Sequence, residues 1–203
     1  MSVVIVEFEA INRALFLMLN APVGLSGASL AFAIAACNYS VLALAAILAF
    51  AAARSQPRNR AYLIYVALAA GLALGINYIL GLAFPHPRPF MIGAGHTFLP
   101  HAPENSFPSD HATLMWTFTF GLLMRRSLRP IGWLAAILAA LTSWARVFLG
   151  LHFPFDVLGS IAVAACALAI LAPSRLWILK SVMPLAARLH LAVPARIGHR
   201  SPP

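Results

Sequence analysis

The chain is built from long apolar runs separated by short polar breaks. A helix needs about 20 mostly apolar residues to cross a bilayer, and every run except the short third one approaches that length. We therefore predict an all-α, polytopic membrane helical bundle of about five to six transmembrane helices, forming a single domain over residues 1–203. The five predicted spans cover residues 30–53, 61–84, 108–124, 131–149 and 154–171.

The two ends of the chain differ from these runs. Within residues 1–22, apolar side chains recur at three- and four-residue steps opposite Glu7 and Arg13, which predicts a short amphipathic helix in the membrane interface. The same residues lack the basic region of a secretory signal, so we expect no cleaved signal peptide. Residues 173–203 mix apolar and basic side chains, which favours an interfacial helix in a basic cytoplasmic tail over a sixth span. The apolar positions of the N-terminal helix are Phe8, Ile11, Leu15 and Leu19.

Composition supports the membrane setting, because 62% of the residues are hydrophobic and only 9% are charged, against about 25% charged in an average soluble protein. In a soluble chain, the formal net charge of +9 would suggest nucleic-acid binding. Here eleven of the fourteen cations fall in three segments on alternate sides of consecutive spans, which marks these segments as cytoplasmic, and we expect no nucleic-acid partner. The three segments contain Arg54, Arg58 and Arg60, then Arg125, Arg126 and Arg129, and finally Arg175, Lys180, Arg188, Arg196 and Arg200.

The two cysteines, Cys37 and Cys166, both fall in apolar runs. We predict that they are small buried hydrophobic side chains. Their number and spacing offer neither a disulfide framework nor a zinc site.

The chemistry-bearing residues gather on the opposite, outer side of the predicted bundle. Ionisable residues at the membrane-embedded end of a bundle are costly and usually functional, so the outer side is expected to bind a polar ligand. Five of the seven histidines fall there, namely His86, His96, His101, His111 and His152. They are accompanied by Glu104, Asp110 and Asp156.

Several of these residues favour an oxyanion as the ligand. Arg88 and Arg146 offer planar forks of donors that match phosphate oxygens, although arginines at this depth also extend towards lipid headgroups. Ser109, behind Pro108, opens the third predicted span, where free N–H groups form an anion site or where the serine simply caps the helix. His111 follows two residues later, close enough to face the same anion.

His152 and Asp156 are four residues apart, a spacing that places them on one face if this segment is helical. A carboxylate bonded to one imidazole nitrogen fixes the tautomer and leaves the other nitrogen free to attack. Such a pair taken alone is more often a structural hydrogen bond, but the neighbouring arginines favour the functional interpretation. Gly150 and Pro154 are predicted to end one helix and start the next, so that Arg146 faces His152 across a tight turn.

The motifs R-P, P-S-x-H and R-x5-H-x3-D, in this order at helix ends, resemble those of the type 2 phosphatidic acid phosphatase superfamily. The longer strings PHPRPF, ENSFPSDHA and WARVFLGLHFPFD are similar to the bacitracin-resistance type of bacterial undecaprenyl-diphosphatase. These motifs cover residues 85–156 and are highly specific.

This resemblance implies a phosphohistidine mechanism that needs no metal or other cofactor. His152 would attack the terminal phosphorus of a lipid diphosphate, Asp156 would orient His152, and His111 would act as general acid and then as general base. The phosphate oxygens would be held by Arg88, Arg146 and Ser109.

One position departs from the superfamily pattern. Gly81 stands where the superfamily has a lysine, and Lys180, the only lysine of the chain, is predicted on the opposite side. His86, if protonated, is a candidate to replace that lysine as a phosphate-binding cation. Asp110 matches the subgroup, with its role open. Glu104 either hydrogen-bonds a protonated diphosphate or merely solvates the loop.

The sequence thus predicts a bacterial inner-membrane phosphatase that converts undecaprenyl diphosphate to undecaprenyl phosphate at the periplasmic face. Its partners would be a polyprenyl diphosphate lipid and membrane lipids, and a homo-oligomer is compatible with the sequence. The alternatives are the same chemistry on phosphatidic acid or phosphatidylglycerol phosphate, and a non-enzymatic lipid-phosphate transporter, which would not need the oriented His152. A metal site is disfavoured because no compact zinc spacing is present among His86, His96, His101 and His111.

Overall fold

The computed structural model describes residues 3–191, and this part of the chain is helical without any strand. The predicted basic tail extends beyond it, so Arg196 and Arg200 lie outside the described residues. Short 3-10 turns cover Pro89–Ile92, Arg126–Leu128 and Ala172–Ser174. The α-helices are α1 (Val3–Leu19), α2 (Gly27–Arg54), α3 (Pro57–Ala83), α4 (Asp110–Leu123), α5 (Arg129–Phe148), α6 (Pro154–Leu171) and α7 (Arg175–Leu191).

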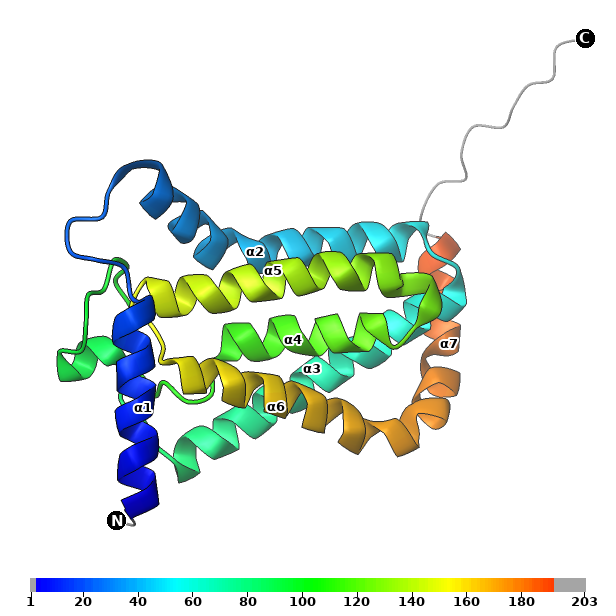
Figure 1. Cartoon of the computed structure of the whole chain (residues 1–203). Coiled ribbons are helices and arrows are strands. Elements are labelled where there is room, and N and C mark those ends of the chain that lie inside the picture. The colour runs from blue at the N-terminus through cyan, green and yellow to red at the C-terminus, as the bar shows by residue number, and fades with distance from the viewer. Residues whose placement is uncertain (1–2, 192–203) are drawn as a thin grey trace, which may run out of the picture.

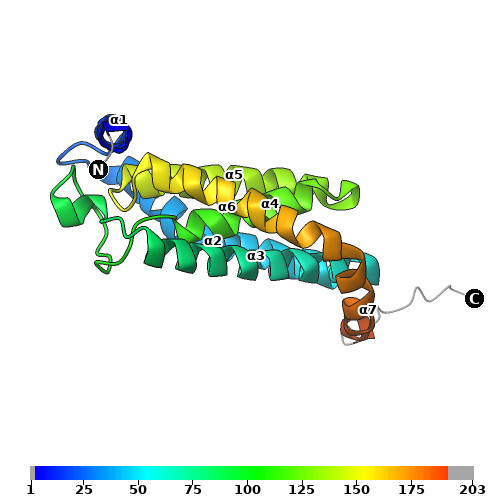
Figure 2. The same ribbon diagram turned by 90° about the horizontal axis from the view of Figure 1, so that it is seen from below.

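Helices α2 to α6 run along one long axis and form the bundle (Figure 1). Helix α1 crosses one end of this bundle and α7 crosses the other, as the view from below also shows (Figure 2). The loop between α3 and α4 and the turn between α5 and α6 both lie at the α1 end. The chain therefore brings the three sequence motifs to one end of the bundle.

Four helical stretches are long and apolar enough to cross a membrane, within the described residues: Gly27–Arg54, Pro57–Ala83, Arg126–Phe148 and Pro154–Leu189. The last of these includes a change of direction between α6 and α7 (Figure 1). Helix α4 has 14 residues, about 21 Å at 1.5 Å per residue, and packs against α3, α5 and α6. The prediction of an all-α multi-pass membrane bundle is confirmed, and its third predicted span is the short central helix.

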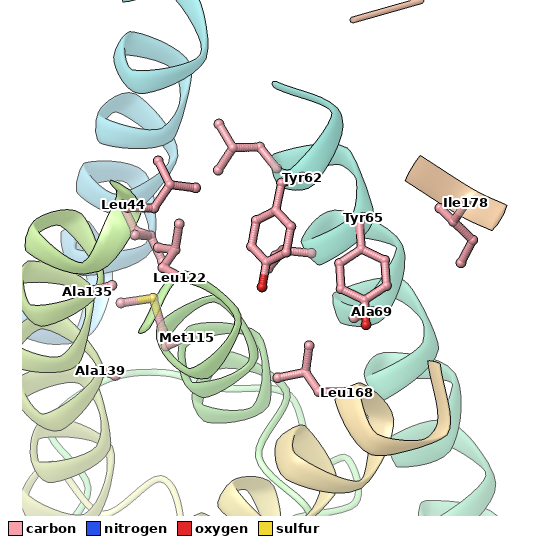
Figure 3. Close-up of a cluster of buried hydrophobic side chains, with 13 residues drawn as sticks. Leu44, Tyr62, Tyr65, Ala69, Met115, Leu122, Ala135, Ala139, Leu168 and Ile178 are labelled. Atoms are coloured by element: carbon pink, nitrogen blue, oxygen red, sulfur yellow. The ribbon is translucent and has the colours of Figure 1, made fainter. Parts of the chain in front are cut away.

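The largest hydrophobic core of the described residues contains side chains from every helix from α2 to α7 (Figure 3). The hydroxyl of Tyr62 in α3 donates to the carbonyl oxygen of Gly121 in α4 at 2.9 Å. The side chains of Met115 and Leu122 are fully buried in this core. A Cβ on Gly121 would lie 2.7 Å from Cγ1 of Val66. Glycine therefore lets the two helices approach closely, as small residues do in membrane bundles.

Cys37 is buried as predicted, whereas Cys166 is exposed. The prediction for Cys166 is wrong because this residue lies beside the buried stripe of α6, which is formed here by Val163, Ala164 and Ala167. An apolar run identifies a spanning helix, but it does not tell which of its faces packs against protein.

Helix α1 covers the motif end with a different face from the one that the apolar pattern singled out. Phe16 is fully buried and Asn12 nearly so. Phe8 and Ile11, on the apolar face, are instead exposed. An exposed apolar face suits a helix in the membrane interface, which stays a prediction.

Candidate active site

The turn between α5 and α6 brings Arg146 and His152 together. The carbonyl oxygen of Arg146 accepts from the backbone N–H groups of both Leu151 (2.9 Å) and His152 (3.2 Å). Gly150 adopts a φ of +79°, and a Cβ there would lie 2.1 Å from the carbonyl oxygen of His96, so the turn requires glycine. Arg146 Nη2 consequently lies 3.2 Å from Nε2 of His152, which confirms that the two residues face each other.

Arg88 reaches the same nitrogen from the loop after α3. Its Nη1 lies 3.0 Å from His152 Nε2. Nη1 also donates to the carbonyl oxygen of Leu151, and Nε donates to the carbonyl oxygen of Glu104, each at 3.2 Å. Arginine only donates hydrogen bonds, so Nε2 of His152 is the acceptor and carries no proton. Neither Arg88 nor Arg146 forms a salt bridge with a carboxylate of the described residues, and both are about 95% buried.

Two buried guanidinium groups without a carboxylate partner are unfavourable unless an anion joins them. Their convergence on one imidazole nitrogen therefore suits the binding of an anion beside Nε2 of His152.

The other ring nitrogen of His152 is held by a residue that sequence reasoning missed. Nδ1 lies 2.9 Å from the carbonyl oxygen of Ser106 and 3.5 Å from Oδ2 of Asp156. The Ser106 hydroxyl donates to the same Oδ2, which also accepts from the N–H of Phe153 at 2.8 Å. Asp156 thus supports His152 partly through Ser106, while it closes the first turn of α6. Ser106 is the first serine of the ENSFPSDHA string, of which only the second, Ser109, was predicted to contact phosphate.

Burial, reinforced by the two neighbouring arginines, lowers the pKa of His152 to about 3. The ring is therefore neutral near pH 7. Its proton sits on Nδ1, where the carbonyl of Ser106 accepts it, and its lone pair sits on Nε2. This is the tautomer that a nucleophile facing the arginines needs.

A cavity of about 350 Å³ lies on the Arg146 side of this arrangement. Arg146 Nε has no hydrogen-bond partner, and Nη1 makes only a 3.9 Å contact with Cys37 Sγ. His101 Nε2 lies 3.4 Å from Arg146 Nη2, and His111 lines the cavity from the start of α4. Nothing in the sequence singled out Asn38 of α2. His101 stood out only as one of the outer histidines and as a candidate metal ligand. The lining residues are Cys37, Asn38, Leu99, Pro100, His101, His111, Arg146 and Leu151.

Ser109 occupies the N-cap position of α4 but makes no side-chain capping hydrogen bond. Its hydroxyl is fully buried and has no hydrogen-bond partner. Its carbonyl oxygen accepts from the Ser160 hydroxyl at 2.9 Å. The hydroxyl of Ser109 is thus free of a capping role, and its contact with phosphate stays a prediction.

Asp110 and Glu104 lie around a different cavity, of about 310 Å³, beside Gly81. Oδ1 of Asp110 accepts from Asn77 Nδ2 at 2.8 Å, which ties α4 to α3. This geometry gives no support for either residue as a phosphate ligand. A Cβ on Gly81 would lie 2.9 Å from Asn105 Nδ2, so a lysine here would have to displace the side chain of Asn105.

His86 lines a different cavity, of about 460 Å³, and not the one beside Arg146, so its role as a phosphate-binding cation stays a prediction. Its two ring nitrogens face the carboxylates of Glu9 and Asp156. His96 contacts Asn20 through backbone atoms. Within residues 3–191, no three His, Cys, Asp or Glu side chains are grouped to hold a metal ion.

Residues 61–179 match the family model described as the PAP2 superfamily, and the chain belongs to this superfamily. It is 38% identical over 127 residues to undecaprenyl-diphosphatase BcrC of Bacillus subtilis (strain 168), which covers 63% of this chain and 65% of that protein, just under two thirds. It is 36% identical over 155 residues to the putative undecaprenyl-diphosphatase YbjG of Escherichia coli (strain K12), covering 75% of this chain and 77% of that one.

The fold is similar to the crystal structure of Aquifex aeolicus LpxE, with a TM-score of 0.61 and 21% identity over 84% of this chain and 95% of that chain. The resemblance inferred from the motifs is confirmed, and at this identity the structural match speaks for the fold alone.

Proposed function

We propose that this protein hydrolyses undecaprenyl diphosphate to undecaprenyl phosphate and inorganic phosphate, and so recycles the lipid carrier of cell-wall synthesis and confers bacitracin resistance. The names of the relatives support this substrate. The observation that carries the reaction type is the meeting of two buried arginines at Nε2 of His152.

In the first step, Nε2 of His152 attacks the terminal phosphorus, and the bond from that phosphorus to the bridging oxygen breaks. Arg88 and Arg146 turn their donors from Nε2 to the phosphoryl oxygens and offset the developing charge. His111 donates a proton to the leaving oxygen of undecaprenyl phosphate. The Nδ1 proton stays on His152, where Ser106 and Asp156 stabilise the positive ring.

In the second step, His111 takes a proton from a water molecule, and the oxygen of that water attacks the phosphorus. The phosphorus–nitrogen bond breaks, its electron pair returns to Nε2, and inorganic phosphate leaves. His111 thus acts as general acid in the first step and as general base in the second.

The orientation follows from the charges. The turn between α4 and α5, which contains Arg125 and Arg126, lies at the opposite end of the bundle from the turn between α5 and α6, which contains His152 (Figure 1). The positive-inside rule therefore supports an active site at the periplasmic face of the inner membrane.

The test is phosphate release by the purified full-length protein from a panel of lipid diphosphates and monophosphates, with and without a chelator. We expect undecaprenyl diphosphate to be preferred, chelator to have no effect, and His152→Ala to lose nearly all activity. His96→Ala is the matched control, since that exposed side chain has no contact in the site. If phosphatidic acid or phosphatidylglycerol phosphate is preferred, that lipid and not undecaprenyl diphosphate is the substrate. If His152→Ala retains lipid transfer, the protein is a transporter.

A further inference from the structure

Helix α1 lies outside the region that matches the superfamily, yet it reaches the catalytic carboxylate through one histidine. Oε2 of Glu9 lies 3.2 Å from Nε2 of His86, and Nδ1 of His86 lies 3.5 Å from Oδ1 of Asp156. Three ionisable groups therefore connect the N-terminal helix to the carboxylate beside His152.

This geometry dictates the charge of His86. Each ring nitrogen faces a carboxylate oxygen, and only the doubly protonated ring has an N–H for both. The Asp156 carboxylate, 3.5 Å from Nδ1, is the main cause that raises the pKa of His86, and Glu9 adds to it against the effect of burial. The His86 side chain is 26% exposed, so water only partly screens these charges.

Asp156 needs a cation at this place. Oδ2 accepts from Ser106 and from the N–H of Phe153. Oδ1 is buried and has no hydrogen-bond partner, and the nearest positive group in a salt bridge with it is His86. A carboxylate held at both oxygens keeps its plane, and that plane fixes the hydroxyl of Ser106, whose carbonyl accepts the Nδ1 proton of His152.

The surrounding contacts hold α1 in the required position. Arg13 Nε donates to Oε1 of Glu9 at 2.8 Å. Oδ1 of Asn12 accepts from the N–H of Phe155 at 3.0 Å. The ring of Phe153 packs edge-on against Phe16 with centroids 5.1 Å apart, and His86 lies on Phe153 at 5.3 Å. Helix α1 is thus docked over the first turn of α6 independently of Glu9.

We propose that Glu9 and His86 are positioning residues: Glu9 keeps His86 in the imidazolium form, and His86 holds Asp156 for Ser106 and His152. The groups that face His86 are Glu9 from α1, itself paired with Arg13, and Asp156 from α6. This makes α1 a part of the active site. The activity readout rests on the proposed phosphatase function, whereas the protonation state of His86 does not.

The activity test compares Glu9→Gln with Glu7→Gln, an exposed glutamate on the same helix. We expect Glu9→Gln to lower kcat about tenfold with KM little changed, and Glu7→Gln to match the wild type. Loss of the Glu9 charge lowers the pKa of His86, so the alkaline limb of the kcat–pH profile should move to lower pH. A Glu9→Gln profile identical to that of Glu7→Gln would overturn the proposal.

The second measurement needs no substrate. In the full chain labelled with ¹⁵N-histidine, the His86 signal is identified by its loss in His86→Gln. We expect two protonated ring nitrogens at pH 7 in the wild type and in Glu7→Gln, whereas Glu9→Gln should lose the second ring proton at a lower pH than the wild type does. A singly protonated His86 in the wild type would refute the proposal even if the enzyme is active. If no lipid is hydrolysed, the phosphatase proposal fails while this spectrum still decides the state of His86.

Discussion

Nδ1 of His152 lies closer to the carbonyl oxygen of Ser106, at 2.9 Å, than to the carboxylate of Asp156, at 3.5 Å. A backbone carbonyl therefore selects the tautomer of His152, the proposed nucleophile. The carboxylate supplies charge and fixes the serine through its hydroxyl.

This relationship predicts a graded response to two substitutions. Ser106→Ala keeps the carbonyl but removes the hydroxyl that reaches Asp156, and one such hydrogen bond contributes about 1 kcal/mol. We expect kcat to fall about five- to tenfold, and Asp156→Asn to fall further because the negative charge is lost. Ser29→Ala, at an exposed site on α2, serves as the control. Equal losses in Ser106→Ala and Asp156→Asn would contradict the division of roles.

The two arginines are predicted not to tolerate lysine. Lysine keeps the charge but lacks the planar fork that reaches Nε2 of His152 and the phosphate oxygens together. Arg88→Lys and Arg146→Lys should each lose about 100-fold in kcat, measured as phosphate release. Arg58→Lys, in the first turn of α3 at the other end of the bundle, should behave as the wild type.

His101 is predicted to act in substrate binding, because it lines the cavity with Arg146 and His111. His101→Ala should raise KM about fivefold or more with a smaller change in kcat, since one hydrogen bond to a charged group contributes about 1.5 kcal/mol. Steady-state kinetics with His96→Ala as the control measures this. An unchanged KM would remove His101 from the binding site.

Gly81 is predicted to be required by the loop that packs on it. Gly81→Ala places a Cβ 2.9 Å from Asn105 Nδ2, whereas a Cβ at Gly75 meets nothing within 4 Å. Alanine is the better helix former by about 1 kcal/mol, so Gly75→Ala should raise the melting temperature in detergent. Gly81→Ala should lower both stability and activity. An increase in both would show that the loop adapts.

The lowered pKa of the buried His152 ring predicts that the folded protein loses stability in acid. Burial lowers its pKa to about 3 in the folded protein, against about 6.5 when unfolded. Between these values the unfolded chain binds more protons, so this contribution is fully present above pH 6.5 and declines as the pH falls towards 3. The melting temperature of the wild type relative to His152→Gln should therefore decrease on going from pH 7 to pH 4. A constant difference would contradict the burial of a neutral ring.

The sequence by itself determined the class of fold and most of the residues that meet at the candidate active site. Continuous apolar runs of about 20 residues predict spanning helices, because each helix satisfies its own backbone hydrogen bonds within the bilayer. The turn built on Gly150 is short, so Arg146 and His152 had to meet.

The tertiary structure alone decided the contacts between distant segments. Ser106 reaches His152 across 46 residues and Glu9 reaches His86 across 77, and periodicity along one helix carries no information on such pairs. The sequence suggested a phosphate-binding cation at His86, because a sequence shows which residues carry charge but not where their side chains point. Its ring turns to Glu9 and Asp156 because packing against Phe153 and the docking of α1 set its environment.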